Sequence, residues 1–113
     1  MAGFKEPIPF ASVGTVKIGP FISDVDGKTP VIDLVIVQAD VRLSKNNQDF
    51  AQKDDTGSAV HDENGWYDIP LNANDTTLVK PGMGATNGHI LISIIKSGAL
   101  PVWRKFVVDA PAP

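Results

Sequence analysis

The sequence contains no cysteine, so neither a disulfide nor a thiolate metal site is available to this chain. Histidine is scarce, with two residues, and apolar runs long enough to cross a bilayer are missing, since the longest, Ile90 to Ile95, is far too short. The first residues show no basic region followed by an apolar run. We therefore expect no secretory signal and no membrane partner.

Helix-forming residues are also rare. The chain has 2 Glu and 6 Leu against 22 Val and Ile, and β-branched side chains favour strands. Its 9 Pro and 10 Gly interrupt any long helical pattern. A chain of 113 residues with this composition predicts one all-β domain with a real core. The net charge of −3 argues against nucleic acid as a partner, because phosphate binding needs a basic face.

What the sequence does contain is a strand-forming pattern, clearest in residues 34–53. Val41 and Leu43 alternate with polar residues, which predicts a strand with one buried face. Asn46-Asn47 suits a tight turn because Asn tolerates the left-handed backbone region. A second strand follows the turn. Such a ribbon is marginally stable alone, so its apolar face requires a second layer.

About seven short strands separated by turns predict an antiparallel β-sandwich. Besides the ribbon and a short strand near residues 59–61, we expect strands at Thr15–Ile18, Val31–Val37, Trp66–Leu71, His89–Lys96 and Pro101–Asp109. The chain then divides into an extended N-terminal arm, a β-sandwich domain and a C-terminal tail, at residues 1–14, 15–109 and 110–113.

Two of these strands allow more detailed predictions. Within Trp66–Leu71 the side chains of Tyr67, Ile69 and Leu71 share the face we expect to be buried. Pro70 donates no ladder hydrogen bond, which predicts a strand at a sheet edge. His89–Lys96 is apolar on both faces, which predicts a central strand. The long polar connection before it suits a crossover between two sheets.

The arm carries three apolar residues, Phe4, Ile8 and Phe10, spaced along a segment that two prolines keep extended. Two interpretations remain open. The arm folds back over its own sandwich, as tethered termini do, or it docks on a neighbouring chain.

Two groups of residues resemble reactive or metal sites. Asp24, Asp26 and Gly27 match the start of a calcium loop, but no Glu follows at the twelfth position, so an Asp-Gly turn is favoured. His61 and the two acids after it would not converge on one ion, because adjacent strand residues point to opposite faces. We expect no catalytic site, no metal and no cofactor, and hence no enzyme.

Trp66 lies on the side of its strand that we expect to face solvent. It would stack on a sugar or a partner, or pack under a loop. With Tyr67 or Trp103 it supports an alternative function as a carbohydrate-binding module.

Several motifs are shared with a known family: QADVRLSKN, FAQK, HDENGWY, PL-N-A-N-D-T and GALPVW-R-K-F-V. Over Gly19 to about Val108 the chain resembles a family of small virion structural proteins of tailed bacteriophages. It departs at Trp66, where the family tends to have Tyr, and in the Gly-rich residues 79–88. The N-terminal arm lies outside the resemblance.

The resemblance implies an immunoglobulin-like β domain that is part of a phage particle and has no enzymatic activity. The expected function is a capsid decoration or cement protein that binds the head lattice in many copies. Its partners would be the major capsid protein or other virion proteins and copies of itself, at the virion surface after assembly in the host cytoplasm. A tail, baseplate or head-fibre accessory is the alternative within the virion. The predicted partner contacts are Phe4, Ile8, Phe10 and Trp66.

Overall fold

The computed structural model describes residues 3–4, 6, 8–9, 11–45, 49–77 and 88–108. Over those residues the chain forms seven β-strands and a short 3-10 turn. In chain order these are β1 (Gly14–Ile18), η1 (Gln38–Asp40), β2 (Val41–Lys45), β3 (Ala51–Gln52), β4 (Val60–Glu63), β5 (Trp66–Leu71), β6 (Gly88–Ile94) and β7 (Val102–Val108).

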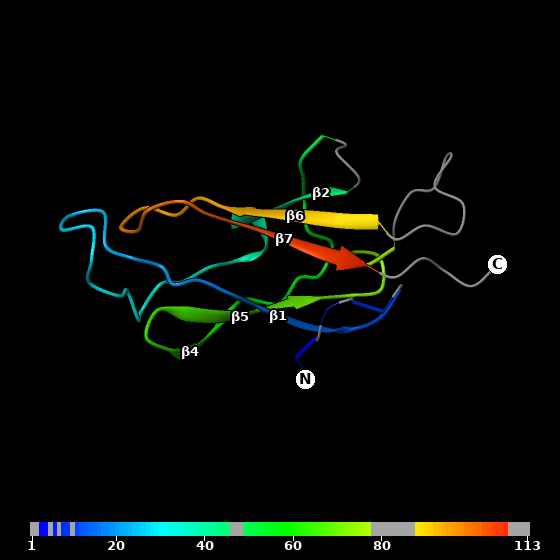
Figure 1. Cartoon of the computed structure of the whole chain (residues 1–113), viewed down its shortest axis with the longest axis horizontal. Coiled ribbons are helices and arrows are strands. Elements are labelled where there is room, and N and C mark those ends of the chain that lie inside the picture. Colours follow the sequence, from blue (N-terminus) through cyan, green and yellow to red (C-terminus); the bar gives the residue numbers. More distant parts are fainter. Residues whose placement is uncertain are drawn as a thin grey trace.

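The strands form two antiparallel sheets stacked face to face (Figure 1). One sheet has three strands in the order β1-β5-β4, and the other has four in the order β3-β2-β6-β7. The predicted all-β sandwich is confirmed. The strand order is that of an immunoglobulin domain, with β1, β5 and β4 in the places of strands B, E and D. Strands β3, β2, β6 and β7 take the places of C′, C, F and G.

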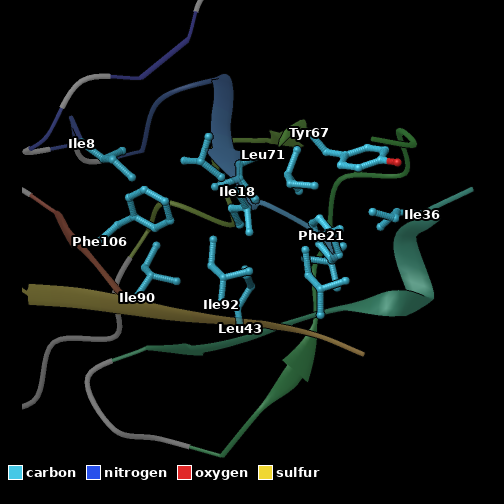
Figure 2. Packing of buried hydrophobic residues seen from close by; sticks show 14 of the residues in the cluster. Ile8, Ile18, Phe21, Ile36, Leu43, Tyr67, Leu71, Ile90, Ile92 and Phe106 are labelled. Carbon is cyan, nitrogen blue, oxygen red and sulfur yellow. The ribbon is translucent and has the colours of Figure 1, made fainter. Parts of the chain in front are cut away.

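The core lies between the two sheets, where alternate residues of each strand meet (Figure 2). On β5 the inward residues Tyr67, Ile69 and Leu71 are fully buried, as the sequence predicts. Ile90 and Ile92 of β6 enter the same core from the opposite sheet (Figure 2). Burial of one side chain of this size stabilises the fold by about 1.5–3 kcal/mol.

The N-terminal arm folds back over its own sandwich at the residues that the structure describes. Ile8 is fully buried next to Phe106 (Figure 2), and its N–H donates to the carbonyl of Val107 at 2.8 Å. Phe4 packs half-buried against the same core, and its N–H donates to the carbonyl of Thr15 at 2.7 Å. The first of the two interpretations of the arm is therefore the one found in this structure.

The predicted ribbon is present but short. Strands β2 and β3 pair with Leu43 opposite Ala51, and Val41 and Leu43 face the core. The turn at Asn46-Asn47 lies outside the described residues.

The prediction of a strand at Val31–Val37 is wrong. The segment is extended but belongs to neither sheet, and Ile32 and Val35 are exposed while Ile36 is buried. Its backbone is bonded to three separate segments, through the Phe21 carbonyl, the Ala59 N–H and the Tyr67 hydroxyl, which bonds both Leu34 and Val31. Because these bonds hold the segment one residue at a time, no continuous ladder forms.

The prediction that β5 is an edge strand is also wrong, because β5 is the middle strand of its sheet. Pro70 lies opposite Thr15 of β1. On the other side the β4 ladder reaches only as far as Val60 opposite Asp68. Pro70 thus sits just beyond the end of β4, so on that side of β5 its missing N–H removes no ladder hydrogen bond.

Strand β6 is central in the four-stranded sheet, as predicted, and the connection from β5 crosses between the sheets. Its outer side is less covered than its composition indicates. Leu91 is half-buried there, and Ile95, just past the strand, is 64% exposed. One face of β6 is therefore the core face, and the other is a surface of the molecule.

Candidate functional site

The four predicted partner contacts lie in different settings. Ile8 is a core residue of its own domain, so contact with another chain through Ile8 would require the arm to leave its place. Phe4 is half-buried beside it, and Phe10 lies outside the described residues. Trp66 is half-buried on β5. Its indole packs against Gly19 so closely that a Cβ atom added to Gly19 would come within 3.2 Å of the ring. Partner contact by these residues stays a prediction.

The aromatic residues offered for carbohydrate stacking are divided between the two sheets. Tyr67 is fully buried, so its ring is not available to a ligand. Trp66 lies on β5 of the three-stranded sheet, whereas Trp103 lies on β7 of the four-stranded sheet and is 58% exposed. The structure therefore does not bring these three rings together into one platform.

The segment that resembles a calcium loop is an Asp-Gly turn, as predicted. Asp26 accepts hydrogen bonds at 2.9 Å from the N–H groups of Lys28 and Thr29, and it also accepts one from the Thr29 hydroxyl. These bonds, with the hydroxyl the strongest, lower the pKa of Asp26 to about 2. Gly27 has a φ of 67°, the left-handed region that favours glycine. The carboxylate thus serves its own turn.

His61 and Asp62 point to opposite sides of β4, as strand alternation predicts. The Nε2 atom of His61 accepts a hydrogen bond from the Gly65 N–H at 3.2 Å, and its ring meets Tyr67 edge-on at 5.0 Å. Asp62 instead pairs with Lys17 of β1. Among the described residues, no group of three or more His, Cys, Asp or Glu is placed to hold a metal ion.

A polar hollow of about 260 Å³ opens beside the start of the crossover. The Lys45 Nζ atom donates to the carbonyls of Asn74 and Thr77 at 2.5 and 2.9 Å. Burial lowers the pKa of Lys45, and amide hydrogen bonds from Asn74 and Asn72 lower the pKa of Asp54. These charged groups are bonded to their own chain, so the hollow is lined by contacts that hold the crossover.

Two buried ionic side chains hold the segment that follows β3. The carboxylate of Asp75 accepts from the N–H groups of Asp54 and Asp55 at 2.7 and 3.1 Å. The Nζ atom of Lys53 donates to the carbonyls of Asp55 and Gly57 at 2.6 and 2.8 Å. Burial lowers the pKa of Lys53. Buried charges with such partners are structural, because an unbonded charge would be costly in the interior.

The outer face of the three-stranded sheet contains a second hollow of about 400 Å³, here named the acidic hollow. Pro70 and Val60, the latter 65% exposed, supply its apolar surface. Asp55 and Asp68 supply carboxylates at its wall. The remaining lining residues are Thr15, Gly57 and Ser58.

The outer face of the four-stranded sheet, here named the basic face, has the opposite charge. Register places its outward residues in two cross-strand rows, Arg42–Ser93–Trp103 and Ser44–Leu91–Lys105. Arg42, Trp103 and Lys105 are exposed, whereas the serines between them are buried. The basic face is therefore a strip of two serines and Leu91 with an exposed indole ring and two cations beside it.

Arg104, between Trp103 and Lys105 on β7, alternates to the core side of the sheet, opposite Ile92. Its guanidinium carbon lies 5.5 Å from the centre of the Phe106 ring, so its stem covers the core edge while its charge stays outside. Glu6 of the arm brings a carboxylate to the end of β7, where it accepts a hydrogen bond from the Val107 N–H at 3.0 Å. The positive charge of the basic face therefore comes from Arg42 and Lys105.

Comparison of the chain with protein-family models, with curated proteins and with solved structures finds no match. In the described part of the chain, no helix is long and apolar enough to cross a membrane.

The basic face and the acidic hollow were not predicted from the sequence. Strand alternation already separates Arg42, Trp103 and Lys105 from the core residues beside them. What alternation does not give is the register that brings β2 and β7 to the two sides of β6. The acidic hollow requires the end of β4 beside Pro70, which is a property of the folded sheet.

Proposed function

We propose that this protein is a bacteriophage virion structural protein, and specifically a capsid decoration or cement protein that binds the head lattice in many copies. The observation that carries the proposal is the set of shared sequence motifs, which resemble those of small tailed-phage virion proteins over Gly19 to about Val108. The partners proposed are the major capsid protein, other virion proteins and further copies of this chain.

The architecture supports this role in a general way. A rigid sandwich whose buried charged groups bind its own backbone offers surface for contact, and a contact made only by the assembled state stabilises that state by mass action. Fold alone does not determine function, so the sandwich adds to the motifs and does not replace them.

The test is the composition of purified virions. Quantitative mass spectrometry should find the protein at a copy number comparable to that of the major capsid protein, and image reconstruction should place its density on the head. Absence from the virion would overturn the proposal. A copy number of about six or twelve, as closed ring symmetry produces, would move the protein to the tail, baseplate or fibre.

A second measurement addresses the cement role directly. Heads assembled without the protein should release their DNA at a lower temperature than complete heads, and added purified protein should restore the difference. Equal release temperatures with and without the protein would contradict a cementing role while leaving a virion location intact.

A further inference from the structure

We propose that the protein associates with itself head to tail, the basic face of one copy seating on the acidic hollow of the next. The two surfaces lie on the outer faces of opposite sheets, and the two sheets are stacked against each other in Figure 1. This inference does not depend on the virion role, because it concerns two surfaces of the isolated chain.

Charge complementarity is the first argument. Around the acidic hollow, four carboxylates stand against two ammonium groups, those of Asp55, Asp62, Glu63 and Asp68 against those of Lys17 and Lys53. The basic face instead presents Arg42 and Lys105, and neither of its two cross-strand rows contains a carboxylate. Surfaces of opposite sign steer encounter and fix orientation in protein association.

Shape and hydrophobicity give the second argument. Trp103 is 58% exposed, at the end of a row whose central residue is the small Ser93. The acidic hollow offers Val60 and Pro70 as an apolar floor in about 400 Å³, a size suited to a bulky ring. Trp and Arg are the residues that most often dominate binding energy at interfaces. The side chain of Trp103 in one copy therefore inserts into the acidic hollow of the next copy and supplies the central contact.

The carboxylates that line the acidic hollow differ in whether they are already paired with a lysine of their own chain. Asp68 lies opposite Lys17 in the β1–β5 ladder, and Lys17 is already paired with Asp62. Asp55 is likewise engaged, 3.6 Å from the Lys53 ammonium. Of the two carboxylates that line the hollow, Asp68 is the one without an ion pair among the described residues, and it is therefore the counterpart of Lys105 from another copy.

The geometry also determines the kind of assembly. Because the two surfaces differ and lie on opposite sheets, the contact is heterologous, and a pair of copies retains one unused surface of each kind. Such a contact produces rows or closed rings. A two-fold contact, in which one surface meets its own copy, would stop at a dimer.

Charge reversal separates these outcomes. Alone, Asp68→Lys and Lys105→Glu should each remain monomeric, because each then brings two like charges together at positions 68 and 105, where the native contact has opposite charges. Mixed in equal amounts, they should associate again, because native Lys105 of one variant meets native Asp68 of the other and the two reversed charges also meet as an opposite pair. Lys28→Glu, in the exposed 22–30 turn, is the matched control and should associate as the native protein does.

The measurement is sedimentation velocity up to a protein concentration of about 1 mM, in the range of weak contacts, with circular dichroism to confirm that each variant is folded. The native protein should show a mass that rises with concentration and falls with added salt. A native mass that stays monomeric throughout, or a mixture of the two variants that stays monomeric, would overturn the proposal.

Trp103→Ala provides an independent check that does not change charge. It should weaken native association at least tenfold, and Trp66→Phe, at the other indole, should not. In the Trp66→Phe protein, fluorescence of Trp103 should shift to shorter wavelength as association proceeds. Association that is unaffected by Trp103→Ala would place the contact elsewhere and refute the insertion of Trp103 into the hollow.

Discussion

At the scale of single residues, the hydroxyl of Tyr67 joins β5 to the irregular 31–37 segment. It donates to the carbonyl of Val31 at 2.6 Å and accepts from the N–H of Leu34 at 3.0 Å. The ring is fully buried and meets Phe21 edge-on at 5.2 Å. One side chain therefore supplies both packing and the polar contacts that a ladder supplies elsewhere.

Tyr67→Phe keeps the ring and removes these two hydrogen bonds. We expect the free energy of unfolding to fall by about 1–3 kcal/mol, because two backbone groups lose their partner away from water. Urea denaturation of the variant and the native protein measures the difference. Val60→Ala, at an exposed position, serves as the control, and equal stability of Tyr67→Phe and the control would show that water replaces the hydroxyl.

The Asp26 turn predicts a pH effect. The hydroxyl of Thr29 and the backbone N–H groups of Thr29 and Lys28 bind the carboxylate and lower its pKa from 3.8 to about 2. A carboxyl group with a depressed pKa in the folded state contributes stability that is present above pH 3.8 and is lost as the pH falls through about 2. We therefore expect the turn to loosen only in that acidic window.

Titration followed by NMR of the Asp26 carboxyl group checks this expectation. Thr29→Val removes the hydroxyl and should raise the pKa of Asp26 toward its ordinary value, whereas Thr29→Ser keeps the hydroxyl and should leave the pKa low. An identical midpoint in the Val and Ser variants would show that the hydroxyl bond is not formed in solution.

At the scale of elements, the N-terminal arm acts as a further edge strand. Ile8 makes an isolated parallel bridge with Val108 of β7, and Gly3 makes one with Thr15 of β1. The arm thus touches both sheets, and the buried side chain of Ile8 is its main attachment.

Ile8→Ala should lower the free energy of unfolding by about 2–4 kcal/mol, the usual cost of truncating a buried Ile. Val13→Ala, near the end of the same arm and 61% exposed, should change it by less than about 0.5 kcal/mol. Chemical denaturation measures both values. If the two variants were equally stable, the arm would not be docked in solution in the way that the structure shows.

Elements also show which predictions from sequence succeed. Strands with clean alternation, such as β5 and β7, were found where the pattern placed them, because burial of one face decides their position. The prediction of a strand at residues 31–37 was wrong because a nearly continuous apolar run indicates burial but does not show whether a partner strand is present. The prediction that Pro70 places β5 at a sheet edge failed for another reason. Proline does avoid positions that need its N–H in a ladder, but β4 ends just before Pro70, so β5 can still be a middle strand.

The candidate surfaces were less predictable than the core for a related reason. Which residues of β2, β6 and β7 face outward follows from alternation, but Arg42 and Trp103 come together only through the register on β6. Register is set by the pairing of distant segments, and a single sequence does not contain it.

At the scale of the whole molecule, both sheets contribute to one cluster of buried residues, so we expect them to unfold together. Trp66 on β5 and Trp103 on β7 offer one fluorescent reporter for each sheet. Unfolding of Trp66→Phe and of Trp103→Phe should give a single transition by fluorescence, coincident with that by circular dichroism. Separate transitions within one variant would show that the sheets are independently stable.

The outer borders of both sheets are blunted. Strand β3 has two residues, and the β4 ladder is irregular between His61 and Glu63. The isolated bridges from Ile8 and Gly3 engage β7 and β1 at their remaining borders. Open strand borders are what allow folded proteins to add to one another as cross-β fibres. A molecule guarded in this way tolerates crowding at high density, and amyloid growth would first have to dislodge the arm.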